Sequence, residues 1–276
     1  MRFSGRELQA ALTLSIALLP CSQAWAQTAP EPFTPTVGQS GKDVVWVPTP
    51  ASLVEKMLDM AKVTQQDIVM DLGSGDGRNI IAAAKRGAHS IGVEFNPDMV
   101  ELSRKTAAAE GVGEKATFIQ GDMYEADISK ATVLALFLLP HNLTKLTPKF
   151  LELRPGTRIV GNTFAPEGWT ADETETIGGE CVSWCTSLLW IVPGKVEGTW
   201  KLPKGELVLK QSFQIISGTL TGGPAPAEVT GKLRGNEITF TAGGADYTGV
   251  IKGDAIEGAV RSGSDTTSWR ATRAGS

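Results

Sequence analysis

The pattern of hydrophobic positions changes near residue 193. Before that point, short apolar runs alternate with segments whose apolar residues recur at helical spacing. The runs predict strands at 67–71, 90–94, 116–120, 131–139 and 157–162. Nearly continuous apolar runs are typical of parallel strands covered on both faces. Strands that alternate with helices in this way predict a doubly wound α/β domain over residues 44–194.

Three of the expected helices carry end signals, among them the helix after the glycine turn at 73–77, which Gly87 ends. Ser52 and Glu55 have the spacing of a capping box and predict a helix start. Asn96 and Pro97 predict an N-cap and the first residue of a later helix, which Gly111 ends. The last helix of this half is expected over 143–153.

After residue 193 the helical period disappears and turn signals follow one another closely. Gly235-Asn236 and Gly253-Asp254 each separate two short strand-like runs, as two-residue hairpin turns do. Ile238 and Phe240 alternate with threonines, so one face of this strand is expected to be buried. Residues 195–276 are therefore predicted to form a small antiparallel β domain, either a curled sheet or a barrel.

The N-terminus has the three parts of a signal peptide. Arg2 and Arg6 precede an apolar stretch over 8–19, and Ala24-Trp25-Ala26 forms a small-x-small cleavage signal. The apolar stretch is too short for a membrane-spanning helix. We predict cleavage after Ala26 and export, with the periplasm as destination; the alternative is an uncleaved amphipathic N-terminus. Residues 27–43, rich in Pro, Thr, Gln and Gly, are predicted to be a linker.

Composition excludes some functions and leaves others open. A net charge of −4 offers no general attraction for nucleic acid. Two histidines and three cysteines are too few and too scattered for a zinc site, so no metal is predicted. Cys181 and Cys185 can form a disulfide only if the segment between them turns, because an extended one would hold them too far apart. Two free, buried thiols are an equally good reading.

The sequence Asp71-Leu72-Gly73-Ser74-Gly75-Asp76-Gly77 carries the main functional signal. It joins the first strand to a helix, but Arg78 stands where a dinucleotide-binding turn has its third glycine. A pyrophosphate would be repelled by carboxylates at this turn. S-adenosylmethionine (SAM) carries an ammonium and a sulfonium, so Asp71 and Asp76 suit it. The glycines allow close approach of the backbone.

Two further acids follow strands at the positions such a site needs. Glu94 ends the second strand, and its carboxylate can accept from both ribose hydroxyls. Asp122 follows the third strand and can accept from the adenine amino group, while Met123 covers the ring. Three acids that follow three successive strands beside a glycine turn predict a SAM site.

These motifs resemble those of a known family. Together with Val47-Pro48-Thr49-Pro50 and Leu138-Leu139-Pro140, they make residues 46–169 similar to bacterial relatives of the mitochondrial protein-lysine methyltransferases that act on the ATP synthase c subunit and the adenine nucleotide translocase. The resemblance implies a seven-stranded, Rossmann-like methyltransferase sheet and does not extend past residue 195. The SAM contacts that it and the motifs assign are Pro48, Thr49, Pro50, Asp71, Leu72, Gly73, Ser74, Gly75, Gly77, Glu94, Phe95, Asp122 and Met123.

The acceptor mouth is expected at the end of the fourth strand. An apolar wall there would lower the pKa of a lysine amine by desolvation and so dispense with a strong base. Phe137 belongs to this wall, and Leu139, Pro140 and Asn142 are its candidate acceptor residues, with Asn142 accepting one amine hydrogen bond. His141 is expected to be a surface residue.

Other parts of the expected site stay open. Phe164 and Trp169 either line the acceptor channel or pack in the core. The Asn/Asp-Pro-Pro-aromatic turn of amide and adenine-amino methyltransferases is absent after the fourth strand, which disfavours those substrates.

The predicted function is therefore SAM-dependent methylation of a lysine in a protein. The alternatives are a small-molecule methyltransferase and an exported, non-catalytic binding or envelope protein that retains the fold. Export conflicts with the cytosolic supply of SAM. No nucleic-acid partner and no stable membrane span are expected, and the oligomeric state is not determined by the sequence.

Overall fold

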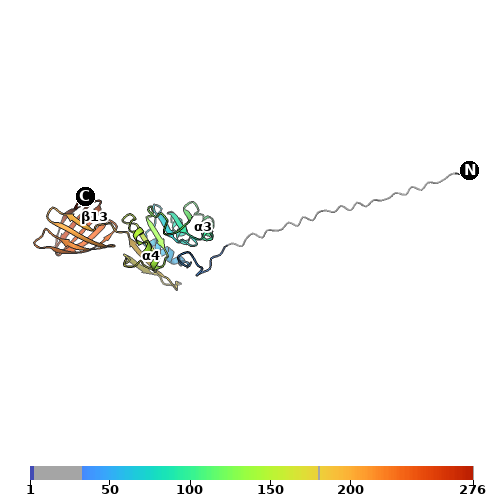
Figure 1. Cartoon of the computed structure of the whole chain (residues 1–276), viewed down its shortest axis with the longest axis horizontal. Helices are drawn as coiled ribbons and strands as arrows, with labels where there is room; N and C mark the ends of the chain where they lie inside the picture. The colour runs from blue at the N-terminus through green and yellow to red at the C-terminus, as the bar shows by residue number, and fades with distance from the viewer. Residues whose placement is uncertain (3–32, 180, 276) are drawn as a thin grey trace. The chain divides into compact units, whose positions relative to one another are not determined.

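The computed structural model describes residues 1–2, 33–179 and 181–275, which include a mixed sheet with helices and a β-barrel (Figure 1). The predicted cleavage signal and the apolar stretch before it lie outside the described residues. None of the helices in the described part of the chain has the length and apolarity that a membrane span needs.

Seven strands form the sheet, in the order β3-β2-β1-β4-β5-β7-β6. They are β1 (Ile68–Leu72), β2 (His89–Glu94), β3 (Ala116–Gln120), β4 (Val133–Leu136), β5 (Arg158–Asn162), β6 (Glu173–Thr176) and β7 (Thr186–Ile191). The first five are parallel, and β7 runs antiparallel between β5 and β6. The predicted doubly wound sheet is confirmed, and it has the seven strands that the resemblance implies. The order in which successive strands are added to the sheet reverses between β1 and β4. In doubly wound folds, ligands bind at this switch point.

Four helices accompany the sheet: α1 (Ala51–Met60), α2 (Arg78–Lys85), α3 (Pro97–Ala109) and α4 (Pro140–Phe150). The start of α3 is as predicted, because the Asn96 side chain accepts from the Asp98 N–H and Pro97 follows it. The capping box at Ser52 is wrong: the N-cap is Pro50, two residues earlier, α1 begins at Ala51, and no side chain caps it. Helix α4 begins earlier than expected because Pro140 takes its first position, which also shortens β4.

Alternate residues of the buried strands build two cores, one on each face of the sheet. Val69 and Val133 pack with the buried residues of α1, α2 and α3. Met70 and Leu134 pack on the other face with α4 and with Trp190. Burial on both faces explains why these strands are nearly continuously apolar.

The remaining strands close into a barrel, in the order β10-β11-β12-β13-β14-β15-β8-β9. They are β8 (Gly198–Lys201), β9 (Glu206–Ser212), β10 (Ile215–Leu220), β11 (Ala227–Arg234), β12 (Glu237–Ala242), β13 (Ala245–Lys252), β14 (Ala255–Ser262) and β15 (Asp265–Arg273). Both predicted hairpins are confirmed, since Arg234 pairs with Glu237 and Lys252 with Ala255. Of the two predicted forms, curled sheet and barrel, the closed barrel is the one observed. The predicted boundary at residue 195 lies between β7 and β8.

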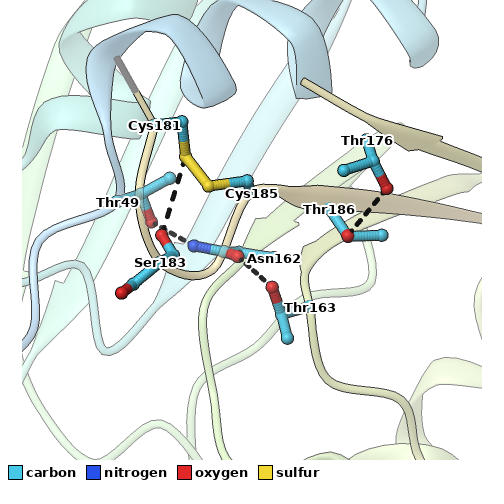
Figure 2. Close-up of a disulfide and its surroundings, with 8 residues drawn as sticks. All are labelled: Thr49, Asn162, Thr163, Thr176, Cys181, Ser183, Cys185 and Thr186. Atoms are coloured by element: carbon cyan, nitrogen blue, oxygen red, sulfur yellow. Dashed lines mark hydrogen bonds between the residues drawn. A yellow bond between two sulfur atoms is a disulfide. The ribbon is translucent and has the colours of Figure 1, made fainter. Parts of the chain in front are cut away.

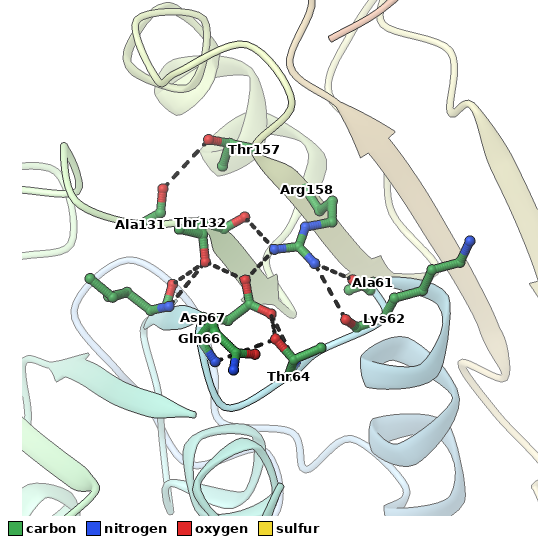
Figure 3. A network of polar contacts seen from close by, with 10 residues as sticks. Ala61, Lys62, Thr64, Gln66, Asp67, Ala131, Thr132, Thr157 and Arg158 are labelled. Carbon is green, nitrogen blue, oxygen red and sulfur yellow. Dashed lines mark hydrogen bonds and ion pairs between the residues drawn. The ribbon is translucent and has the colours of Figure 1, made fainter. Parts of the chain in front are cut away.

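A polar network at the start of β1 ties three strands together (Figure 3). Asp67 accepts from the Thr132 hydroxyl at 2.7 Å and from the Thr64 backbone N–H at 2.8 Å, and it forms an ion pair with Arg158. The Arg158 guanidinium also donates to the Ala61 carbonyl at 2.7 Å, just beyond α1. This network lies at the end of the sheet opposite the carboxyl ends of β1 and β2, so its role is to hold the strands together.

Candidate functional site

A pocket lies at the carboxyl ends of β1, β2, β3 and β4, and we call it the strand-end pocket. Its floor is the glycine turn after β1, and its walls include Asp71, Glu94 and Asp122. Residues 39–47, which we call the entry strap, form another wall. The strap is a closed loop, because Gln39 and Trp46 are joined through the Trp46 N–H and the Gln39 carbonyl at 3.0 Å.

The glycine turn brings bare backbone to the pocket. Gly73, Gly75 and Gly77 have φ angles of 73°, 56° and 80°, which side chains rarely adopt. The N–H of Gly73 donates to the Val93 carbonyl at 2.8 Å and thereby fastens the turn to β2. A Cβ on Gly75 would lie 2.8 Å from the Trp46 indole nitrogen, so the turn and the strap leave no room for a side chain there.

Asp71 is the most unusual acid of the pocket. Its side chain is 3% exposed, and Oδ2 accepts from the Asn79 amide at 2.9 Å, while Oδ1 has no hydrogen-bond partner among the described residues. Burial raises the pKa of Asp71 well above its usual value, the Asn79 hydrogen bond opposes the shift, and the charges of Glu94 and Asp76 add to it. An unpaired, buried carboxylate oxygen beside a pocket calls for a cation or a hydrogen-bond donor.

Glu94 is held in one orientation by the backbone. Oε2 accepts from the Gly75 N–H and Oε1 from the Asn96 N–H, both at 2.9 Å. Each carboxylate oxygen has a second acceptor site, so Glu94 can still receive a pair of hydroxyl groups. The two backbone contacts make Glu94 a preorganised acceptor.

Asp122 stands at the outer rim. Its Oδ1 accepts from the Tyr124 N–H at 2.9 Å, and its Oδ2 pairs with the ammonium of Lys42 on the entry strap. The Lys42 hydrogen bond, followed by the Tyr124 N–H, lowers the pKa of Asp122. The same ammonium lies 5.2 Å from the centroid of the Phe95 ring. Lys42 therefore covers the part of the pocket where an adenine ring was predicted.

Most of the predicted SAM contacts lie on the strand-end pocket. Those lining it are Pro48, Thr49, Asp71, Gly73, Ser74, Gly75, Glu94, Phe95, Asp122 and Met123. Pro50, Leu72 and Gly77 do not line it. Leu72 is fully buried in the core, and Gly77 is the N-cap of α2, where a Cβ would meet Phe118 at 2.7 Å.

Asp76 also lines the pocket, but its charge has a partner within the protein. The Arg78 guanidinium donates to both of its carboxylate oxygens, with Nε 2.9 Å from Oδ1. Arg78 also donates to the Thr49 carbonyl at 2.7 Å and so ties the segment before α1 to the glycine turn. Asp76 thus fixes the local structure, and Asp71 is the acid left for a cationic ligand.

The acceptor residues predicted after β4 occupy different surroundings. Phe137 lines the strand-end pocket, whereas Leu139, Pro140 and Asn142 do not. Asn142 is fully buried, and its amide donates to the Tyr124 hydroxyl at 2.8 Å. Their assignment to the acceptor mouth stays a prediction.

The two aromatic residues after β5 have different roles. Trp169 is 2% exposed and stacks on Phe213 with a centroid separation of 5.3 Å, so it packs in the core. Phe164 is half-buried and stacks on Phe137 at 6.1 Å. His141 is an exposed residue of the first turn of α4, as expected of a surface histidine.

Two groups of site residues were not predicted from the sequence. Residues 39–43 were assigned to a linker by composition, yet they line the pocket. Nothing in their polar sequence shows that they fold back over the strand ends. Asn79, the orienting partner of Asp71, follows the glycine motif by two residues, and this position was a usable signal.

Three comparisons with known proteins agree with this geometry. The sequence model of the ANTKMT methyltransferase domain matches residues 71–173. A protein-lysine N-methyltransferase of Saccharolobus islandicus is 44% identical over 133 residues, which are 47% of this chain and 83% of that protein. The lysine N-methyltransferase of the ATP synthase c subunit from Rattus norvegicus is 35% identical over 138 residues, 50% of this chain and 63% of that protein.

A solved structure extends the likeness to three dimensions. The crystal structure of an RNA methyltransferase from Salinibacter ruber, in complex with S-adenosyl-L-homocysteine, has a TM-score of 0.51 and 43% sequence identity. The match covers 54% of this chain and 96% of that chain.

Proposed function

This chain belongs to the family of the protein-lysine N-methyltransferases, and from that premise we propose that it methylates the side-chain amine of a lysine in a protein. It is a SAM-dependent methyltransferase. The observation that carries the proposal is Asp71, whose buried Oδ1 lacks a partner among the described residues at the edge of a pocket lined with backbone. This is an environment for a cationic ligand.

The residues present fit SAM. Asp71 would hold its ammonium, the backbone from Gly73 to Gly75 would lie against its methionine part, and Glu94 would accept from its ribose hydroxyls. Asp122 and Phe95 would hold the adenine. When bound, SAM supplies an activated methyl group that is transferred to a nucleophile in line with the departing sulfur.

The chain's own residues have two tasks in this reaction. They align the acceptor with the pocket and keep water away from it. A lysine amine is a nucleophile only after it loses a proton, and its usual pKa is about 10.4. Phe137 borders the pocket with an apolar surface, and desolvation against such a surface lowers the pKa of the amine. The acceptor can then lose its proton to solvent before it is fully enclosed.

The test separates protein from other acceptors. We expect radiolabelled SAM and a bacterial lysate to yield label in protein that protease releases and ribonuclease does not. Acetylation of the lysate converts lysine amines to amides, which are not nucleophilic, and is expected to abolish labelling. Label in RNA would support an activity like that of the Salinibacter ruber neighbour instead, although the net charge of −4 argues against it. Label only in small molecules would support the alternative of a small-molecule methyltransferase.

Glu94→Gln provides the matched control for this experiment. The amide keeps the size of the side chain but removes a charged acceptor, and about tenfold weaker SAM binding is expected. Calorimetry with SAM tests the alternative of a non-catalytic protein. A chain that binds no SAM would be a non-catalytic protein that retains the fold.

We place the protein in the periplasm after cleavage behind Ala26. The signal-like N-terminus motivates this proposal, and the disulfide between Cys181 and Cys185 supports it, because disulfides persist in oxidising compartments. A periplasmic enzyme would need SAM outside the cytosol. Alkaline phosphatase fused to the C-terminus would be active only after export, and an inactive fusion with a reduced Cys181–Cys185 pair would contradict the proposal.

A further inference from the structure

Three aromatic side chains from separate segments meet beside the strand-end pocket. Phe137 follows β4, Phe164 follows β5, and Trp184 lies in the loop between β6 and β7. The ring centroids of Phe137 and Phe164 are 6.1 Å apart with an interplanar angle of 15°, and those of Phe137 and Trp184 are 6.1 Å apart at 58°. Phe137 also lines the pocket, so this aromatic cluster borders the site of the methyl donor.

A disulfide closes the loop that carries Trp184 (Figure 2). Cys181 and Cys185 are bonded, with Cα atoms 5.9 Å apart, which corrects the reading of two free, buried thiols. The loop is anchored on both sides. The Ile177 N–H donates to the Cys185 carbonyl at 2.9 Å, and the Thr163 N–H, at the end of β5, donates to the Thr186 carbonyl at 2.7 Å.

The position of Trp184 is imposed by the loop and not by burial. Its side chain is 43% exposed, although two phenylalanine rings are nearby. Its φ angle is 52°, in a region that bulky residues rarely adopt and that persists only where the surrounding structure enforces it. The ring closed by Cys181 and Cys185 supplies that constraint. The loop therefore holds an exposed tryptophan beside the strand-end pocket.

We propose that Phe137, Phe164 and Trp184 form the wall that binds the acceptor lysine, and that the disulfide positions Trp184 in it. This inference rests on the proposed function. The aromatic faces attract the lysine as it arrives, while it is still an ammonium, and the rings pack against its methylene chain. Desolvation against the same wall then favours loss of the proton. The loop sequence over 177–185 contains one acid and no Lys or Arg, so no cation of the loop opposes an incoming ammonium.

The experiment observes Trp184 directly. The full chain has seven tryptophans, so it is labelled with 5-fluorotryptophan, and the Trp184 signal in the fluorine NMR spectrum is assigned with Trp184→Phe. The probe is n-butylammonium, which has the length of a lysine side chain, and 1-butanol is its neutral counterpart. With S-adenosylhomocysteine bound, n-butylammonium is expected to shift the Trp184 signal saturably. 1-Butanol is expected to bind more weakly by about two- to fivefold.

Variants test the wall and the disulfide separately. Phe164→Leu and the double substitution Cys181→Ser/Cys185→Ser are each expected to weaken n-butylammonium binding by about two- to fivefold, without a change in affinity for S-adenosylhomocysteine. Val182→Ala is the matched control, because Val182 belongs to the same loop and is 94% exposed. It is expected to bind the probe like the unaltered chain.

The possible failures are distinguishable. A Trp184 signal that does not move, in protein that binds S-adenosylhomocysteine and methylates lysine, would overturn the aromatic wall and leave the proposed function intact. Equal binding of 1-butanol, or equal effects of Phe164→Leu and Val182→Ala, would also overturn it. A chain without affinity for S-adenosylhomocysteine would overturn the proposed function and this inference together.

Discussion

The ammonium of Lys42 forms an ion pair with the carboxylate of Asp122, across the rim of the strand-end pocket. Lys42 comes from the entry strap, and Asp122 follows β3, so the pair joins a segment before the first helix to the sheet. The hydrogen bond to Asp122 is the main reason that the pKa of Lys42 is raised. Lys42 therefore stays charged at neutral pH and occupies the carboxylate that we propose for the adenine amino group.

Removal of this charge is expected to strengthen SAM binding. Lys42→Met frees Asp122 to accept from adenine and removes a positive charge that repels a cationic ligand, so affinity should rise about two- to fivefold. Lys42→Arg keeps the charge and serves as control, with affinity near that of the unaltered chain. Calorimetry at low and moderate salt measures both. Weaker binding by Lys42→Met would show that the pair's main effect is to hold the strap closed.

Asp71 predicts a pH dependence of SAM binding. Because burial raises its pKa, Asp71 retains a proton in the ligand-free protein to a pH above its usual range. An ammonium beside it favours the ionised form, so binding releases a proton, and affinity falls as the pH falls through the raised pKa. Calorimetry in buffers of different ionisation enthalpy measures the released proton.

The Asp71→Asn variant is the companion measurement. It should bind SAM roughly 30-fold or more weakly and release no proton at this site, since it lacks the charge that pairs with the ammonium. In the unaltered chain, a rise in pH strengthens SAM binding but weakens the ligand-free fold. Because the pKa of Asp71 is raised on folding, its ionisation destabilises that fold as the pH rises above about 3.9. Equal proton release by the variant and the unaltered chain would contradict the assignment.

Gly75 and Gly111 form a matched pair for testing the glycine turn. Both have positive φ, 56° and 72°, so an alanine at either costs about 1 kcal/mol of stability. Only at Gly75 would the new Cβ meet a neighbour, the Trp46 ring at 2.8 Å, whereas nothing lies within 4 Å at Gly111. Gly75→Ala should therefore reduce SAM affinity by about tenfold, on the order of 1.4 kcal/mol, and Gly111→Ala should leave it unchanged. If Gly75→Ala and Gly111→Ala bound SAM with similar affinity, the entry strap would have to move aside easily.

The Asp67 network predicts acid sensitivity of the fold (Figure 3). Burial alone would raise the pKa of Asp67, but hydrogen bonds from Thr132, Thr64 and Arg158 outweigh it and lower the pKa. A lowered pKa contributes stability that is present above the unfolded value of about 3.9 and is lost as pH falls through the folded value. Asp67→Asn should cost about 1–3 kcal/mol in urea unfolding at pH 7.

That cost should shrink as the pH falls from about 3.9, the unfolded pKa, through the lowered folded pKa, below which Asp67 is neutral in both states. The control is Asp246→Asn, since the pair of Asp246 with Arg261 is exposed on the barrel. Its effect at pH 7 is expected to stay within about 0.5 kcal/mol. A cost of Asp67→Asn that does not change with pH would mean that packing, not charge, accounts for it.

The sequence by itself determined the parts of this protein that depend on short-range order. Apolar runs, the Asn96-Pro97 start of α3 and the glycine hairpins predicted the α/β sheet and a β domain, because each signal lies within a few residues of the element that it specifies. Asp71, Glu94 and Asp122 were also predictable as one site. Each follows a parallel strand, and the carboxyl ends of parallel strands meet at one edge.

Only the tertiary structure decided which distant segments reach that edge. Composition assigned Lys42 to a linker, yet it pairs with Asp122, 80 residues away in the chain. The sequence allowed Cys181 and Cys185 to be bonded or free. The structure shows them bonded, because the loop between β6 and β7 turns and brings them together. Trp184 reaches Phe137 for the same reason. Such contacts depend on how loops are closed and anchored by the packed sheet, and no local pattern of residues encodes that closure.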